Sequence, residues 1–254
     1  MQISLDAPWL IAFFLALVRA SVWLMMVPPF SVSAVIPPQG AIGIAAGLAF
    51  LEAPRLVAAG GIPTDTASFI GAVIVQVFTG LALGFIVRTI ISAFSAGGSF
   101  ASLFGGLALP PSMDVLENTQ TLLFGQFYEM VAILLLFASN GEMLLVRGFM
   151  TSFNTPGLSV GSFGPVASVA TSEVATFFVA SLEIVAPILA VLFVAQIVIA
   201  LMAKAAPQVN AWWLGLPLQV ILSLILVAIG IRTMPAYLAQ AVERALSGMA
   251  ALAR

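Results

Sequence analysis

Four charged side chains lie inside long apolar runs of this sequence: Arg19, Arg88, Glu129 and Glu183. At the centre of a membrane helix, each such charge costs roughly 2.5–3.5 kcal/mol on insertion scales. Charges in these places can carry ions or protons along a pathway, or they can pair between helices or subunits and hold the packing together. The chain has no histidine and no series of neighbouring acidic groups, so we expect structural pairing and keep a proton relay as the alternative.

Further polar residues interrupt or end the apolar runs. Gln76 shares a run with Arg88, and Lys204 begins a polar turn that ends at Asn210. We expect the members of this group to act in packing and assembly: Gln76, Lys204, Pro207, Gln208 and Asn210.

No pattern of residues predicts catalysis. The absence of cysteine and histidine removes disulfides, thiolate chemistry, most zinc sites and the usual general base. The sequence has no P-loop and no metal-spaced carboxylates. We therefore expect no enzyme activity, no cofactor and no metal site.

The composition indicates a membrane protein. Of 254 residues, 62% are hydrophobic and 7% are charged, against roughly 25% charged residues in soluble domains. The mean hydropathy is +1.18. A soluble chain of this size cannot bury so much apolar surface, so most of it must face lipid or apolar protein. This excludes a cytosolic enzyme, a nucleic-acid binder and a disordered protein, and it predicts an all-α polytopic membrane protein.

Long apolar runs predict five helices, and the first is read as a span rather than a cleaved signal. After Pro235, apolar residues recur at helical spacing and predict an amphipathic tail helix. With 40–51 counted as a span, the lysines and arginines favour six spans with both ends inside. The predicted long helices cover approximately residues 8–28, 69–94, 121–139, 174–203 and 212–232.

Several shorter segments predict breaks. Residues 40–51 predict a short, tilted or re-entrant helix that ends in a polar turn at Glu52–Arg55. Gly97-Gly98 is expected to end the long run before it, as a flexible loop element. Residues 99–112 and 143–153 are too short to span, and 159–172 predicts a loop.

Two pairs of glycines have the Gly-x-x-x-Gly spacing, which lets membrane helices approach closely. They are Gly43 with Gly47 and Gly80 with Gly84. Close packing of helices is the expected role for both pairs.

The turn AAPQVN at 205–210, followed by LGLPL at 214–218, resembles a signature of the FliR family of type III secretion export-gate proteins, which includes the injectisome counterpart SctT. Other segments resemble family motifs in the same order: Leu17–Arg19 with Val35–Pro37, Gln76–Gly80 with Leu83–Phe85, Ala96-Gly97 before Gly105 and Asp114, Phe137–Gly141, and Ser152-Phe153 with Pro156.

The resemblance implies bent helical hairpins with re-entrant segments in one membrane domain. It implies a FliP-like part at 1–170, a FliQ-like hairpin at 171–234 and an amphipathic C-terminal helix at 235–254. The implied partners are FliP-like and FliQ-like subunits in one hetero-oligomer, FlhB-like and FlhA-like proteins, unfolded secreted substrates and membrane lipid. The implied location is the bacterial inner membrane, at the flagellar basal body.

The resemblance also implies that a loop points into the export channel and plugs it. The residues implied for this loop are Phe104, Gly105, Gly106, Leu107, Leu109, Asp114 and Glu117. The turn with Pro207, Gln208 and Asn210 favours a flagellar over an injectisome protein. A secondary transporter of a small solute is the main alternative function, and a membrane assembly factor is a third.

Overall fold

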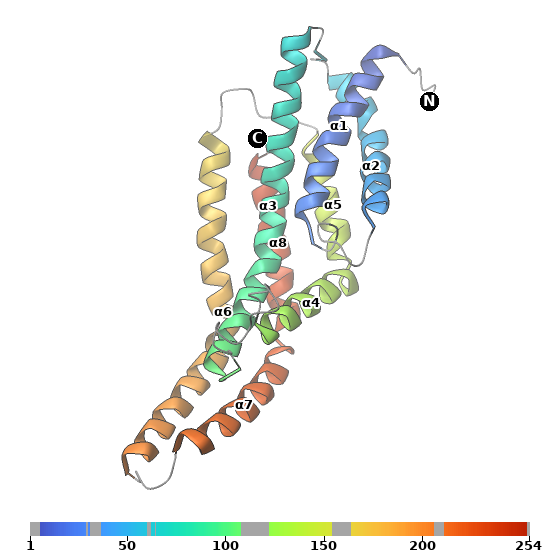
Figure 1. Cartoon of the computed structure of the whole chain (residues 1–254). Coiled ribbons are helices and arrows are strands. Elements are labelled where there is room, and N and C mark those ends of the chain that lie inside the picture. The colour runs from blue at the N-terminus through green and yellow to red at the C-terminus, as the bar shows by residue number, and fades with distance from the viewer. Residues whose placement is uncertain are drawn as a thin grey trace. The chain divides into compact units, whose positions relative to one another are not determined.

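The computed structural model describes residues 6–28, 30, 37–59, 62–63, 65–107, 122–153, 164–205 and 211–252. Every regular element in these ranges is a helix, which confirms the predicted all-α class (Figure 1). The helices are α1 (Ala7–Met26), α2 (Pro38–Ala59), α3 (Thr66–Phe104), α4 (Leu123–Ala138), α5 (Gly141–Thr151), α6 (Gly164–Ala205), α7 (Ala211–Gly230) and α8 (Met234–Leu252).

Within the described ranges, four helical segments are long and apolar enough to cross a membrane: Ala7–Met26, Gln39–Ala58, Thr66–Phe104 and Thr171–Ala205. Two further helix pairs, α4 with α5 and α7 with α8, are each broken by a bend and raise the number to six if each pair forms one span. The chain is therefore a multi-pass α-helical membrane protein.

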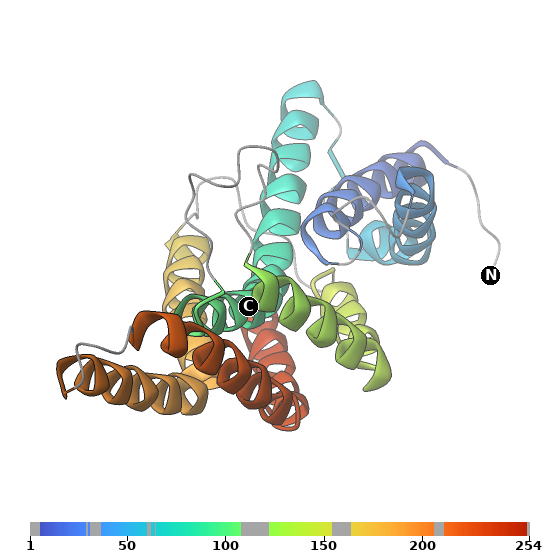
Figure 2. The same cartoon turned by 60° about the horizontal axis from the view of Figure 1, so that its bottom comes forward.

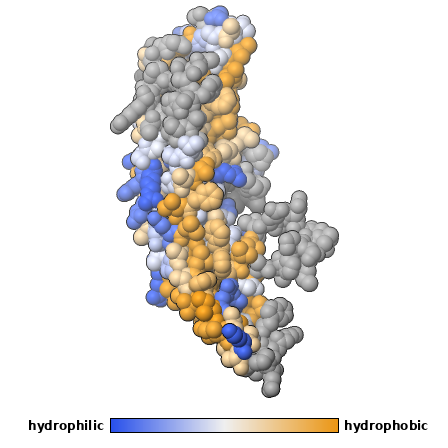
Figure 3. All heavy atoms as spheres, turned by 90° about the vertical axis from the view of Figure 1, so that its left-hand side faces the viewer, coloured by the Kyte–Doolittle hydropathy of each residue, from blue (hydrophilic) through white to orange (hydrophobic). Residues whose placement is uncertain are grey.

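Large apolar side chains cover much of the exposed surface. In the view of Figure 3, hydrophobic residues form a broad band over the face turned to the viewer. On α6, Phe193, Val194 and Leu201 are each about 60% exposed, and Ile221 and Ile229 on α7 are similarly exposed. Such a surface is stable only against lipid or other apolar protein.

The helices cluster into two compact units. The first unit comprises Met1–Ile90, Ser139–Ala175 and Ala241–Arg254, and the second comprises Ile91–Ala138 and Thr176–Gln240. In the second unit, α7 and the adjoining half of α6 lie side by side in both Figures 1 and 2. Gly215 of α7 packs directly on Ile199 of α6, which holds this hairpin closed.

The prediction of a short helix at 40–51 with a turn at Glu52–Arg55 is wrong. Helix α2 has 22 residues and continues through Pro54. A carboxylate oxygen of Glu52 lies 2.8 Å from a guanidinium nitrogen of Arg55, three residues on, and this pair stabilises the helical conformation. Membrane helices tolerate an internal proline when neighbouring groups compensate for the lost backbone hydrogen bond.

The prediction that Gly97-Gly98 ends a helix is also wrong, because α3 continues to Phe104. Both glycines are buried. A Cβ atom at Gly97 would lie 3.1 Å from the carbonyl oxygen of Ser181, and one at Gly98 would clash with the backbone of Phe124. These glycines serve close helix packing rather than loop flexibility.

One other predicted boundary is wrong, and two local predictions are confirmed. Residues 164–172, predicted as a loop, form the first turns of α6. The tight turn predicted at Asn140-Gly141 is confirmed, because Asn140 has a φ of 55°, in the left-handed region. The apolar stripe predicted for the tail helix comprises Leu238, Val242, Ala245, Met249 and Leu252, and the first four of these are buried in α8.

The start of α3 is set by a capping aspartate. One carboxylate oxygen of Asp65 accepts hydrogen bonds of 3.1 Å from the backbone N–H groups of both Ala67 and Ser68. The Ser68 hydroxyl donates to the other oxygen, and these hydrogen bonds hold the pKa of Asp65 below its usual value. The helix therefore begins at a residue whose charged form is favoured by its own capping contacts.

The glycine pair of α3 brings α1 and α3 into contact, as predicted. A Cβ atom at Gly80 would lie 2.8 Å from the carbonyl oxygen of Arg19, and one at Gly84 would lie 2.5 Å from Cβ of Met26. The pair on α2 behaves differently, since nothing lies within 4 Å of such an atom at Gly43 or Gly47. The described part of the chain leaves this second face uncovered.

Substitutions at these two glycine pairs should differ in their effect on stability. Gly80→Ala places a methyl group against a backbone carbonyl that cannot move aside, and we expect a loss of about 1–3 kcal/mol from the resulting strain. Gly43→Ala adds helix propensity in open space and should cause no loss. The melting temperatures of both variants can be measured in detergent-solubilised host membranes. Equal stability of the two variants would contradict the close α1–α3 contact.

Candidate functional site

A buried guanidinium joins three helices of the first unit. Arg19 of α1 is 1% exposed. Its Nε donates to the side-chain oxygen of Gln76 on α3 at 2.5 Å. Its terminal nitrogen donates to the carbonyl oxygen of Ser152, just after α5, at 2.8 Å and to the Ser152 hydroxyl at 3.2 Å. Arg19 and Gln76, 57 residues apart in the sequence, are thus joined by a hydrogen bond between α1 and α3.

Aromatic rings enclose this arginine. The guanidinium carbon lies 4.2 Å from the ring centroid of Phe153, which is a cation–π distance. Phe149 packs edge-on against Phe153 at 5.3 Å and stacks on Trp23 of α1 at 4.5 Å. The Arg19 guanidinium thus donates hydrogen bonds to oxygen acceptors and also lies over the face of the Phe153 ring.

A second buried charge in the same unit was missed by the sequence analysis. Glu52 is fully buried, and one of its oxygens forms the ion pair with Arg55, whose side chain is 54% exposed. The other oxygen, Oε2, has no hydrogen-bond partner among the described residues. The signal available in the sequence was a Glu followed three residues later by an Arg, which fits a helix as well as a turn.

The other charges singled out from the sequence are not brought together. Arg88, Glu183 and Lys204 are exposed, and Glu129 is partly buried. Within the described ranges none of them forms an ion pair. The residues Pro207, Gln208 and Asn210 lie outside the described part of the chain.

In the second unit, the residues implied for the gate loop begin at a well-defined helix end. Gly106 has a φ of 75°. The N–H of Leu107 donates to the carbonyl of Ser102 at 3.1 Å, and the N–H of Gly105 donates to Ala101 at 2.8 Å. This is the Schellman type of helix termination, which needs a left-handed residue and so favours glycine.

Two glutamines hold this end of α3. The carbonyl oxygen of Phe104 accepts a hydrogen bond of 2.6 Å from Nε2 of Gln219 on α7, and Nε2 of Gln196 on α6 lies 3.4 Å away. A Cβ atom at Gly105 would lie 2.6 Å from that of Ser223 on α7. Helix α3 therefore ends against the α6–α7 hairpin, with its last carbonyl satisfied by side chains.

Ser102 connects the two sides of the implied loop. Its hydroxyl accepts a hydrogen bond of 2.9 Å from the backbone N–H of Phe124, in the first turn of α4. Gly98 and Gly125 allow the backbones of α3 and α4 to touch nearby. Leu107 thus comes directly after the anchored end of α3, and Leu122 comes directly before the anchored start of α4. The other predicted loop residues, Leu109, Asp114 and Glu117, lie outside the described residues.

The polar groups in these places hold the helices together and do not converge on a reactive centre. In the described ranges no group of three or more His, Cys, Asp or Glu residues could hold a metal ion. What the arrangement provides is a multi-pass helical membrane protein whose buried polar contacts join helices distant in sequence.

Comparison with known proteins places this membrane protein in a family. The family model described as bacterial export proteins, family 1, matches residues 10–245. The chain belongs to this family.

Named relatives are similar to the chain along most of its length. The flagellar biosynthetic protein FliR of Bacillus subtilis is 27% identical over 222 residues, covering 86% of this chain and 85% of the relative. FliR of Escherichia coli is 24% identical over 221 residues, covering 87% and 84%. The surface presentation of antigens protein SpaR of Shigella sonnei is 23% identical over 209 residues, covering 79% and 78%.

The buried arginine makes a quantitative prediction. Gln76→Leu removes one acceptor from a buried guanidinium, and we expect it to cost about 1.5–3 kcal/mol. For a chain of this size that corresponds to about 3–12 °C in melting temperature. The double variant Arg19→Leu with Gln76→Leu removes the unpaired charge as well, so it should be less destabilised than Gln76→Leu alone.

Gln126→Leu is the matched control, because Gln126 is an exposed helical glutamine. It should leave the melting temperature unchanged. A Gln76→Leu protein as stable as this control would mean that the Arg19 cluster contributes nothing to the fold.

Proposed function

We propose that this chain is a non-catalytic, channel-forming subunit of a flagellar type III export apparatus. The family match along residues 10–245 carries the proposal, since it includes almost the whole chain. The flagellar assignment is supported by the FliR proteins among its relatives, which cover about 85% of both chains. The bacterial inner membrane, at the flagellar basal body, is the proposed location.

In this role the chain assembles with FliP-like and FliQ-like subunits into one hetero-oligomer beside FlhB-like and FlhA-like proteins. Unfolded flagellar proteins pass through the channel that the oligomer forms. The large exposed apolar area on α6 and α7 supports the assembly step, because such a surface needs apolar neighbours. A transporter of small solutes is less well supported, since the buried arginine is fully used in helix packing.

We infer the internal division from the same resemblance. Residues 1–170 form the FliP-like part, 171–234 the FliQ-like hairpin and 235–254 the amphipathic C-terminal helix. The bend between α7 and α8 lies next to the boundary at 234/235, whereas α6 runs without a break through the boundary at 170/171.

Co-expression tests the assembly. With FliP-like and FliQ-like proteins from the same organism, the chain should purify as one defined complex, whereas without them it should aggregate or be degraded. Phe193 of α6 is 58% exposed, so Phe193→Ser should lower the yield of complex several-fold if this face contacts protein. Phe193→Leu, which stays apolar, is the control.

Two results would contradict this proposal. A long-lived, monodisperse monomer in detergent would show that the chain needs no partners. Equal yields of complex from Phe193→Ser and Phe193→Leu would show that this part of α6 faces lipid alone.

The loop that follows Phe104 is the proposed plug of the channel. Apolar residues gathered in a constriction exclude water and so block ions. Gly106, with its left-handed backbone, is where the chain leaves α3 toward this loop. The anchored helix ends at Ser102 and Phe124 give the loop a fixed base.

A charge at the base of the loop should open a leak. Gly106→Asp is expected to raise ion conductance across the membrane in assembled complexes, measured in cells or planar bilayers. Gly106→Asn is the matched control, because the Asn side chain has the same shape as that of Asp but carries no charge. Asn also tolerates the left-handed region. An assembled Gly106→Asp complex with no added conductance would place the seal elsewhere.

A further inference from the structure

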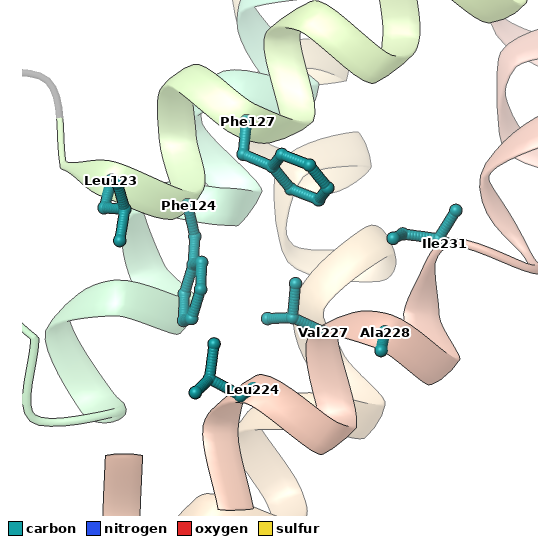
Figure 4. A pocket seen from close by; sticks show the side chains of 7 residues that line it. All are labelled: Leu123, Phe124, Phe127, Leu224, Val227, Ala228 and Ile231. Carbon is teal, nitrogen blue, oxygen red and sulfur yellow. The ribbon is translucent and has the colours of Figure 1, made fainter. Parts of the chain in front are cut away.

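An apolar groove runs between α4 and α7 in the second unit. Seven side chains line it, all of them apolar: Leu123, Phe124, Phe127, Leu224, Val227, Ala228 and Ile231. In Figure 4 the side chains of the two helices point toward one another across this space. Phe124 and Val227, each 4% exposed, form the floor, whereas Leu123 and Leu224 form an open rim at 62% and 50% exposure.

The groove has the dimensions of a ligand site rather than a packing defect. Its volume is about 340 Å³, more than twice the roughly 150 Å³ of an engineered apolar cavity that binds benzene. Its lining residues on α7 are spaced i, i+3, i+4 and i+7, so they follow the helix for about 10 Å. A slender, flexible hydrocarbon chain fits an open apolar groove of this length.

A positively charged residue directly follows the last lining residue of this groove. Arg232 comes after Ile231 in the sequence and is exposed. Within the described residues it forms no ion pair. Helix α8 begins two residues later, at Met234, and the positive end of its dipole favours an anion nearby.

We propose that the α4–α7 groove binds one acyl chain of an anionic phospholipid whose phosphate is held by Arg232. Arginine suits this role because its planar guanidinium matches two phosphate oxygens at once. The apolar lining supplies binding energy for the chain, and the charge supplies the preference for an anionic headgroup. The site thus ties a defined lipid to the bend between α7 and α8.

Fluorescence quenching by brominated lipids tests this site in the assembled protein. Phe127→Trp places a reporter in the groove with an aromatic-for-aromatic change, and Leu123→Trp provides a second reporter on the rim. Signals from the four native tryptophans are subtracted using the unsubstituted chain. One set of nanodiscs contains brominated phosphatidylglycerol with unlabelled phosphatidylcholine. The other set contains brominated phosphatidylcholine with unlabelled phosphatidylglycerol.

At the groove reporters we expect about a fivefold preference for phosphatidylglycerol over phosphatidylcholine, as one arginine near a phosphate would give. Arg232→Gln should remove this preference. Lys204→Gln, which neutralises the other described cation of the second unit, should leave it unchanged. A reporter at the exposed position Ile42 on α2, made as Ile42→Trp, should show no preference.

Three outcomes would overturn the proposal. Equal quenching by both lipids at the groove reporters would mean that no headgroup is recognised. A preference that survives Arg232→Gln would assign the recognition to another residue. No quenching by either lipid at the groove, with normal quenching at position 42, would mean that an apolar segment of a protein partner fills the groove.

Discussion

The surroundings of this chain are apolar, so its buried polar groups must find their partners inside the protein. The hydroxyl groups of α3 illustrate the constraint at its simplest. Thr79, Thr89 and Ser99 each donate to the carbonyl oxygen four residues earlier, at 2.8–2.9 Å. Arg19 obeys the same rule over longer distances, since its acceptors come from two other helices. A group that cannot reach water becomes a link between helices.

This requirement acts together with close packing by glycine. Where α3 meets α1, Gly80 removes the side chain that would push the backbone of Arg19 away. The short separation of the two helices is what allows Arg19 to reach Gln76, one turn earlier on α3. The polar contact and the glycine contact therefore depend on each other, as is common for helix pairs in lipid.

The apolar exterior raises the question of which neighbours cover it. In the proposed assembly, protein covers part of the hairpin formed by α6 and α7, and lipid covers the rest. The groove lined by Phe124 and Val227 is followed in sequence by Arg232, whereas Phe193 lies among exposed apolar side chains of α6. In this arrangement, different parts of one apolar surface bind protein and lipid. The shape and charge of each part determine which of the two it binds.

The sequence alone determined the class of the protein, most of its helices and its family resemblance, because composition and apolar periodicity follow from the solvent that a chain must face. It also indicated that Arg19 and Gln76 serve packing. It misplaced the ends of α2 and α3, since Pro54 and Gly97-Gly98 signal breaks in water. In the structure, Glu52 pairs with Arg55 along the helix, and the two glycines admit the backbones of Ser181 and Phe124. Only the tertiary structure decided these points. The two glycines contact residues of other helices, and the contact between Glu52 and Arg55 forms only if the helix continues past Glu52.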